Sequence, residues 1–447
     1  MKKLRIAINA QVMPDAGYGG IVTVLRALAA LPELSGTSEE YVFVGPHENY
    51  DWIRSILPPG QTVVRGPKFM SPSIPTVDRA ESFKRQLGSL RPLARGVKQF
   101  LAQLPTNVAT RSVENKTAEH FDPRTARDFF QSLACDVIHF PFQAFEDCGL
   151  PSIYNPHDLQ HFHLPQFFTD EEISRREKIY PMACRSAHTI VVASQMVKQD
   201  VVQRFGLQPG KVKVIPWAPP LLEGLPNELN ENDLRDIIEK YELTGMPFVL
   251  YPAMTWEHKN HLRLLDAIAL LRKREKLNFR VICTGFKTDF WPRIHEKLGE
   301  LDLKQFVQFP GLVSLAELSA LYRRAQFIFV PTLFEAMSAP VFEAWQHGVP
   351  VACSTVTSLP EQVDDAALLF DPYSVEAIAA ALERLNTDPF LRHGLVQRGR
   401  HRLEQFSLER TARAYRAVYR SAAGQDLTEE DRELLRDNAM HKSRKVG

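Results

Sequence analysis

Two glutamates eight positions apart, Glu335 and Glu343, are the residues whose spacing points most directly to chemistry. They lie in TLFEAMSAPVFEAWQHGVPV, residues 332–351, and the stretch from Ala336 to Ala339 between them is small or apolar. Pro340 is typical of a helix start, which predicts Glu335 in the preceding loop and Glu343 in the first helical turn. Carboxylates at the positive end of a helix can accept hydrogen bonds from sugar hydroxyls, while free N–H groups there bind phosphate. The pattern therefore favours a sugar-phosphate site over two solvated glutamates.

A second polar cluster lies in YNPHDLQHFHLPQFF, residues 154–168, where His157, His161 and His163 accompany Asp158. His157 and His161 are spaced i, i+4, and on one helical face they could bind zinc with a further ligand. The segment lacks the glutamate of an HExxH motif, and its prolines disfavour a regular helix. Zinc binding and plain packing are both alternatives to a role at a catalytic site.

A glycine-rich turn, GYGG at residues 17–20, precedes a helical pattern and resembles part of a dinucleotide fingerprint. The fingerprint GxGxxG requires glycine where Val22 stands, and no acidic residue closes the strand at 41–45, so NAD binding is not favoured. No GxxxxGK[ST] phosphate loop occurs. A glycine turn at a helix N-terminus remains, where backbone N–H groups can face an anion; a simple tight turn is the alternative.

The elements that must position these residues form two tandem series of short apolar strands and helices. In the first series we predict strands at 4–12, 41–45, 135–142, 151–156, 188–194 and 211–217, with a helix at 21–31. In the second we predict strands at 247–253, 279–285, 305–311, 326–331 and 349–354, with helices at 260–274 and 315–325. This order is typical of a parallel, doubly wound α/β sheet, and its repetition predicts two Rossmann-like domains.

We place the domain boundary near the acidic stretch 229–236. The N-terminal domain is then 1–225 and the C-terminal domain 226–405. A helical segment within 406–427 is expected to cross back to the first domain, and 428–447 forms a charged tail.

The composition excludes several function classes. The chain has 447 residues, 44% of them hydrophobic and 24% charged, which fits two globular domains rather than a disordered or fibrous protein. A net charge of +1 argues against electrostatic binding of nucleic acid. The five cysteines are widely spaced without a CxxC pair, which indicates a reducing compartment. No apolar run approaches the roughly 20 residues of a membrane span, so we expect a cytoplasmic protein without a signal peptide.

Residues 66–130 do not follow the strand–helix rhythm, and we interpret them as an insertion in the first domain. Between positions 68 and 98 there are seven Lys or Arg residues against two acidic ones. Such a patch could contact anionic lipid headgroups at the inner face of a membrane, or a phosphorylated acceptor. The alternative is a solvated helix face or a loop.

These motifs together resemble the GT-B glycosyltransferases of group 1, or family 4, which use nucleotide sugars and retain the anomeric configuration. Glu335 and Glu343 match the E-x7-E motif of that family, and YPAMTWEHKNHLRLLDA at 251–267 is similar to its basic motif. Further similar segments lie at 154–168, 191–206, 309–325 and 358–374. The resemblance implies two Rossmann-like domains facing a central cleft, with the donor on the second domain and the acceptor on the first.

Carried over by position, the resemblance implies that Lys259 binds the donor diphosphate and stabilises charge on the leaving nucleotide. His258 is added beside it only because the chain lacks an arginine that is common in the family. It implies that Glu335 binds the donor sugar and supports an oxocarbenium-like centre, while Glu343 binds the ribose. The other implied donor positions are mainly backbone contacts: Met337, Ser338 and Ala339 at the sugar and phosphates, and Val313 near the base. Gly19 and Gly20 are further donor-side candidates, from the glycine-turn pattern alone.

On the acceptor side, the resemblance implies that His157 faces the cleft near the transferred sugar and that Asp158 orients its loop. The chain departs from the family at Ala253, where an arginine is common, and at Ala336-Met337-Ser338, where Gly-Phe-Gly is common. Phosphate binding is therefore expected to depend more on Lys259. No D-x-D occurs, which agrees with a donor site that uses neither metal nor cofactor.

The expected function is a retaining, metal-independent hexosyltransferase that moves a sugar to a saccharide or lipid-linked acceptor in polysaccharide assembly. GDP-mannose is the favoured donor, and UDP-hexoses are the alternative; the oligomeric state is left open. A non-catalytic nucleotide-sugar-binding homologue and a nucleotide-sugar epimerase of the same fold are the rival functions.

Overall fold

The structure is a computed structural model that describes residues 3–12, 19–34, 38–47, 51–67, 123–220 and 229–436. Most of the predicted basic insertion, 66–130, lies outside the described residues, and so does the end of the charged tail.

The first half of the chain forms a seven-stranded sheet in which all paired strands are parallel, in the order β3-β2-β1-β4-β5-β6-β7. Its strands are β1 (Leu4–Asn9), β2 (Glu39–Gly45), β3 (Thr62–Arg65), β4 (Val137–Phe140), β5 (Ser152–Tyr154), β6 (Thr189–Val192) and β7 (Val212–Val214). Its helices are α1 (Gly19–Ala29), α2 (Leu31–Leu34), α3 (Asp51–Ile56), α6 (Pro123–Ser132), α7 (Gln160–His163), α8 (Asp170–Ser186) and α9 (Gln195–Phe205), with short 3-10 turns η2 (Pro165–Phe167) and η3 (Pro209–Lys211).

The second half forms a six-stranded parallel sheet in the order β10-β9-β8-β11-β12-β13. Its strands are β8 (Phe248–Pro252), β9 (Arg280–Thr284), β10 (Val307–Gly311), β11 (Phe327–Val330), β12 (Val351–Ser354) and β13 (Leu368–Phe370). Its helices are α10 (Glu231–Lys240), α11 (His261–Lys273), α12 (Trp291–Glu300), α13 (Leu315–Arg324), α14 (Ala339–Gln346), α15 (Leu359–Val363), α16 (Val375–Thr387) and α17 (Pro389–Leu403), with a 3-10 turn η4 (Glu257–Lys259).

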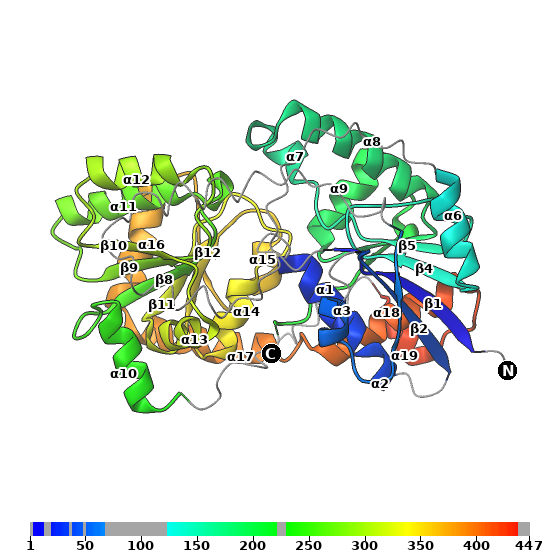
Figure 1. Ribbon diagram of the computed structural model, residues 1–447. Coiled ribbons are helices and arrows are strands. Elements are labelled where there is room, and N and C mark those ends of the chain that lie inside the picture. Colours follow the sequence, from blue (N-terminus) through cyan, green and yellow to red (C-terminus); the bar gives the residue numbers. More distant parts are fainter. Residues whose placement is uncertain are drawn as a thin grey trace, which may run out of the picture.

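The strand order reverses in each sheet at its first strand in sequence, β1 in one and β8 in the other (Figure 1). Short, fully buried strands such as β4 and the wholly apolar β11 are what a sheet covered on both faces requires, because neither face meets water. In open parallel sheets, ligands bind outside the carboxyl ends of strands near such reversals. The loops that follow β5, β8 and β11 are therefore the places to look for a site.

The last long helix, α18 (Leu408–Ala422), is followed by α19 (Glu429–Leu434) and lies with the first sheet in Figure 1. Its apolar side contributes Tyr415, Val418 and Tyr419 to a core cluster shared with β1 and β2. A buried polar chain adds to this packing: Tyr419 Oη lies 2.7 Å from His139 Nδ1, and His139 Nε2 lies 2.9 Å from Asn155 Oδ1. The helix therefore joins the end of the chain to the first sheet by both apolar and polar contacts.

Candidate functional site

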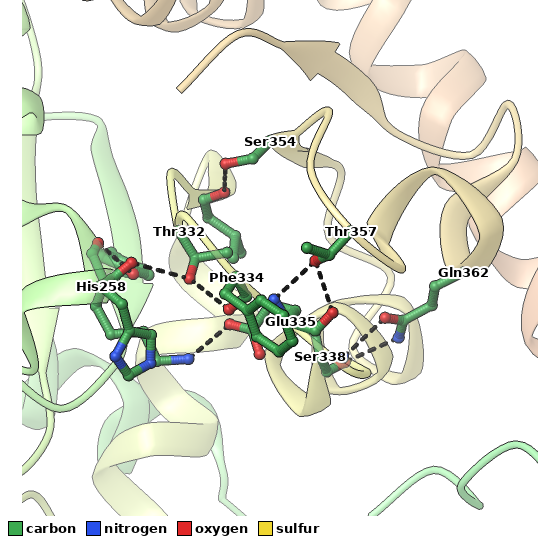
Figure 2. Close-up of polar contacts among 11 residues, drawn as sticks. His258, Thr332, Phe334, Glu335, Ser338, Ser354, Thr357 and Gln362 are labelled. Atoms are coloured by element: carbon green, nitrogen blue, oxygen red, sulfur yellow. Dashed lines mark hydrogen bonds and ion pairs between the residues drawn. The ribbon is translucent and has the colours of Figure 1, made fainter. Parts of the chain in front are cut away.

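Glu335 lies in the loop between β11 and α14, as the proline pattern predicts, and its backbone is fixed from outside the loop (Figure 2). The Glu335 amide donates to Thr357 Oγ1 at 2.9 Å, and the same hydroxyl donates to the Glu335 carbonyl at 2.7 Å. Inside the loop, Thr332 Oγ1 donates to the Phe334 carbonyl at 3.0 Å. These bonds occupy the backbone amide and carbonyl of Glu335, so its carboxylate is the group that can bind a ligand.

The Glu335 carboxylate is paired with Lys259, whose Nζ lies 2.6 Å from Glu335 Oε1. The two side chains are only 20% and 13% exposed, so the ion pair is partly shielded from water. Lys259 ends η4, and the buried Tyr251 hydroxyl holds it by donating to the Lys259 carbonyl at 2.8 Å. The two residues that the sequence assigns to the donor sugar and the diphosphate are thus in direct contact.

Glu343 is the fifth residue of α14 and therefore begins the second helical turn. The prediction that it lies in the first turn was wrong by one position. The helix begins at Ala339, one residue before Pro340, because proline fits either of the first two positions. Tyr322 Oη donates to Glu343 Oε2 at 2.5 Å. Burial raises the pKa of the Glu343 carboxyl, and the Tyr322 hydrogen bond opposes that shift.

The backbone before α14 is held by Gln362, which the sequence did not single out. Ser338 N donates to Gln362 Oε1 at 2.8 Å, and Gln362 Nε2 donates to the Ser338 carbonyl at 2.9 Å. The Ser338 amide is therefore occupied, in contrast to its expected role at a sugar or phosphate. Among the described residues, no group accepts a hydrogen bond from the backbone N–H of Met337 or Ala339.

The helix after Lys259 begins at His261. Asn260 occupies the position before α11, but it has a left-handed backbone with φ 63° and makes no side-chain cap. Its buried Nδ2 donates instead to the carbonyls of Pro331 and Pro372, each at 2.9 Å. Asn260 therefore ties the basic loop to the loop after β11 that carries Glu335.

His258 and Val313 are two further residues expected on the donor side. Burial and the adjacent Lys259 cation place the pKa of His258 well below its ordinary value, so the ring is neutral at pH 7. The His258 carbonyl accepts a hydrogen bond from Leu333 N at 2.8 Å, which again joins the basic loop to the Glu335 loop. Val313 is half-buried in the turn between β10 and α13.

On the first domain, His157 follows β5 in a left-handed conformation with φ 65° and is 6% exposed. Its Nε2 lies 2.8 Å from the Pro141 carbonyl, and burial lowers its pKa. Asp158 Oδ1 accepts from Gln160 N at 3.0 Å and so shapes the turn into α7. The role expected of Asp158 in orienting its loop stays a prediction.

The three histidines of this segment do not converge. His163 Nε2 lies 2.6 Å from Asp200 Oδ2, whereas His161 is buried against Tyr180. Helix α7 begins only at Gln160, so His157 and His161 do not share a helical face. Nowhere in the described ranges do three His, Cys, Asp or Glu side chains form a group that could hold a metal ion.

Gly19 and Gly20 lie inside the first turn of α1, so the helix starts two residues earlier than the predicted turn allows. Gly17 and Tyr18 lie outside the described residues. The glycine pair remains at a helix N-terminus, but as part of the helix rather than before it.

The Glu335 loop lies against the first domain. Leu333, Phe334 and Ala336 belong to the core cluster formed by β4, β5 and their helices. The rings of Phe334 and His163 have their centroids 5.4 Å apart. The site thus combines second-domain carboxylates with the first-domain segment that carries His157 and Asp158.

Four residues that hold the site were not identified from the sequence: Tyr251, Tyr322, Thr357 and Gln362. Thr357 and Gln362 border or lie in the segment 358–374, whose motif was noted without a role. The sequence pattern predicts Tyr251 and Tyr322 as core residues of a strand and a helix. That their hydroxyls donate hydrogen bonds at the site is known only from the folded structure.

Two family models match the chain. One describes glycosyl transferases of group 1 and matches residues 234–402, and the other describes glycosyltransferase family 4 and matches residues 101–218. The first contains Lys259, Glu335 and Glu343, and the second contains His157 and Asp158.

Named relatives are similar over part of their length. An O-antigen chain mannosyltransferase B of Escherichia coli is 28% identical over 59% of this chain and 69% of its own. An MMP alpha-(1->4)-mannosyltransferase of Mycolicibacterium hassiacum is 27% identical over 53% of this chain and 55% of its own. The matched regions thus span between about half and about two thirds of these two relatives.

Solved structures share the fold across nearly the whole chain. A glycosyltransferase from Rickettsia africae has a TM-score of 0.66 at 14% identity and covers 95% of this chain and 100% of its own. Anabaena HepE in complex with UDP and glucose has a TM-score of 0.62 at 16% identity and covers 94% of this chain and 100% of its own.

No helix in the described ranges has the length and apolar character that crossing a bilayer demands.

Proposed function

This chain belongs to the group 1, or family 4, glycosyltransferases and has their GT-B fold, and from that premise we propose that it transfers a hexose from a nucleotide-diphosphate sugar to a saccharide or lipid-linked acceptor. The single observation that carries the proposal is the Lys259–Glu335 ion pair beside the start of α14. A cation for the diphosphate and a carboxylate for the sugar lie within one hydrogen-bond distance of each other.

Lys259 serves the leaving group in this proposal. Transfer breaks the bond between the anomeric carbon and the diphosphate oxygen, and negative charge grows on that oxygen. A fixed cation in a partly buried site stabilises such charge more in the transition state than in the ground state. When donor phosphate is present, the Lys259 amine exchanges part of its contact with Glu335 for the phosphate oxygens, so Lys259 takes the role that a metal ion has in other transferases.

Glu335 and Glu343 hold the two sugars of the donor. The Glu335 carboxylate accepts hydrogen bonds from hydroxyls of the transferred hexose and faces the positive charge that develops at its anomeric carbon. Glu343 accepts hydrogen bonds from the ribose hydroxyls, and Tyr322 fixes one of its oxygens in place. The N–H groups of Met337 and Ala339 at the α14 N-terminus remain for the phosphates, since Gln362 occupies that of Ser338.

The acceptor binds on the first-domain side, where the segment that carries His157 meets the Glu335 loop through the rings of His163 and Phe334. The acceptor hydroxyl oxygen bonds to the anomeric carbon on the face that the diphosphate leaves, and its proton passes to the leaving phosphate. Same-face attack retains the anomeric configuration and needs no protein base. His157, kept neutral by burial, contributes a hydrogen bond to the transferred sugar and no charge.

We favour GDP-mannose as the donor, and assembly of a polysaccharide or glycolipid as the setting. Support comes from two relatives whose names describe mannosyltransferases. UDP-hexoses are the alternative, since HepE was solved with UDP and glucose.

The test incubates the purified protein with GDP-mannose or UDP-glucose and an alkyl α-mannoside as acceptor, and follows the product by mass spectrometry and NMR. We expect an added α-linked mannose, and a rate lower by about 10²–10³-fold in Glu335→Gln, because an electrostatic partner of the reacting centre is lost. Glu376→Gln, an exposed carboxylate in the first turn of α16, is the matched control.

An unchanged rate in Glu335→Gln would contradict the assigned role. A β-linked product would contradict retention, and an epimerised nucleotide sugar would identify the epimerase alternative. Binding of a nucleotide without any sugar transfer from either donor would favour a non-catalytic homologue.

A further inference from the structure

A short segment of the second domain, Thr357 to Gln362, contacts both the first domain and the Glu335 loop; we call residues 357–362 the bridge segment. Thr357 and Ser358 precede α15, while Glu361 and Gln362 lie in it. We infer that this segment couples the position of the first domain to the geometry of the donor site, with Glu361 as its positioning residue. The expected change in kcat rests on the proposed function, whereas the expected change in the structure of the Glu335 loop does not.

The contact with the first domain is made at the N-terminus of α9. The Glu361 carboxylate accepts from Gln195 N at 2.8 and 2.9 Å and from Met196 N at 3.3 Å. The first N–H groups of a helix have no partner within it, and the helix dipole favours negative charge there. A carboxylate from the second domain therefore completes a helix of the first through charge-assisted hydrogen bonds.

A buried hydroxyl pair lies beside this contact. Ser194, the cap residue of α9, accepts from Val197 N at 3.2 Å, and its Oγ lies 2.7 Å from Ser358 Oγ. Both serines are fully buried. A buried hydroxyl without a partner is destabilising, so this pair holds the two domains at a defined distance here.

The other side of the bridge segment holds the donor loop. Thr357 Oγ1 bonds both the amide and the carbonyl of Glu335, and Ser358 N donates to the Glu335 carbonyl at 3.2 Å. Gln362 bonds both backbone groups of Ser338, at the start of the helix that carries Glu343. Adjacent residues of one segment thus contact the first domain and both carboxylate-bearing elements.

Two features make the bridge segment rigid rather than a compliant linker. Thr357 has φ 50°, a conformation that is strained for a β-branched residue. Arg402, 5% exposed on α17, donates to the carbonyls of Glu361 at 2.7 Å and Gln362 at 3.0 Å. Because surrounding contacts hold this strained segment in place, it is rigid, and a shift of α9 therefore moves the Glu335 loop as well.

The test compares wild type, Glu361→Gln, Gln362→Ala and the control Glu376→Gln. Hydrogen exchange is followed in peptides covering 194–201 and 332–342, GDP and UDP affinities are measured by calorimetry, and transfer is measured as above. Glu361→Gln removes the charge but keeps the shape. We expect faster exchange in both peptides, an about tenfold lower kcat and nucleotide affinity within twofold, because misplacement of reacting groups lowers the rate of chemistry rather than binding.

Gln362→Ala separates the two sides of the segment. We expect faster exchange at 332–342 only, and a similar loss of kcat. The proposal is overturned if Glu361→Gln speeds exchange at 194–201 while 332–342 and kcat stay at wild-type values, because Glu361 is then an interdomain contact without coupling. If wild type transfers no sugar at all, the proposed function fails, and exchange at 332–342 alone decides the coupling.

Discussion

At the scale of single residues, Glu343 is a carboxylate kept in an unfavourable environment. Burial raises the pKa of its carboxyl, and only the Tyr322 hydroxyl opposes that shift. Because the pKa of Glu343 is raised in the folded state, its contribution to the free energy of unfolding is fully present below the ordinary pKa of 4.5. That contribution is lost as the pH rises through the raised pKa. A ribose whose hydroxyls satisfy the carboxylate would compensate for this cost.

Glu343→Gln is therefore predicted to be more stable than wild type at pH 7.5 in the absence of nucleotide, by roughly 1 kcal/mol. The amide resembles the protonated carboxyl and can still accept from Tyr322. Urea denaturation at pH 7.5 and pH 4 measures the difference, which should vanish at the lower pH. A variant that is less stable at pH 7.5 would show that the carboxylate is a stabilising group, contrary to this interpretation.

At the scale of elements, the loop after β8 and the loop after β11 form one unit. Asn260 Nδ2 bonds the carbonyls of Pro331 and Pro372, and Arg263 Nη1 donates to Asn260 Oδ1 at 3.0 Å. The left-handed backbone at Asn260 is tolerated because asparagine adopts it at lower cost than most residues. Asn260 therefore fixes the position of the Lys259 loop relative to the Glu335 loop.

Asn260→Ala is expected to lower the free energy of unfolding by about 2–4 kcal/mol, since it leaves two carbonyls without their donor and strains the backbone. Asn386, whose exposed Nδ2 bonds Asn278, provides a matched control: Asn386→Ala should change stability by less than about 1 kcal/mol. Denaturant melts of the two variants test this; equal effects would contradict the role given to Asn260.

The elements differ in how well the sequence predicts them. Buried strands such as β8 and β12 are continuous apolar runs bounded by proline or polar residues, so their positions could be predicted and are confirmed. β3 and β13 were not predicted because both are edge strands in which most residues are only partly buried or exposed. The capping geometry at Asn260 could not be predicted, since its partners lie 71 and 112 residues away.

At the scale of the whole molecule, several buried histidines are required to be neutral. Burial lowers the pKa of His139 to about 3, of His161 to about 4 and of His261 to about 3. His139 accepts from Tyr419 and donates to Asn155, so its protonation would disrupt the attachment of α18 to the first sheet. The unfolded chain binds protons on these residues near pH 6.5, whereas the folded chain does so only near pH 3–4.

Stability should therefore decrease as the pH falls from about 6.5 toward 4, with a loss on the order of several kcal/mol in total. Equilibrium urea denaturation at pH 7.5, 6, 5 and 4.5 measures the slope. His139→Gln should flatten this slope even though it lowers stability at pH 7.5, while His401→Gln, at a largely exposed position, should leave the slope unchanged. A profile that is flat from pH 7 to 4.5 in wild type would contradict the prediction.

At this scale the two-domain arrangement follows from the tandem strand–helix pattern, whereas the contact between the domains does not. Glu361 and Gln195 are 166 residues apart, and neither belongs to a motif that indicates the other. The carboxylates of the site were predictable because a helix start and their spacing constrain them locally. The residues that hold them in place act through the folded chain and could be identified only from the structure.

In the proposed function, the second domain holds a nucleoside diphosphate through Glu343 and Lys259. Calorimetric titration of GDP and of UDP into wild type, Glu343→Gln and Lys259→Met, without added metal, tests it most directly, with Lys276→Met as the control for an exposed lysine paired with Glu383. We predict micromolar binding of one nucleotide by wild type and the control, and affinity at least tenfold weaker in the two site variants. Equal binding by Glu343→Gln and wild type, or no binding of either nucleotide by wild type, would contradict the account.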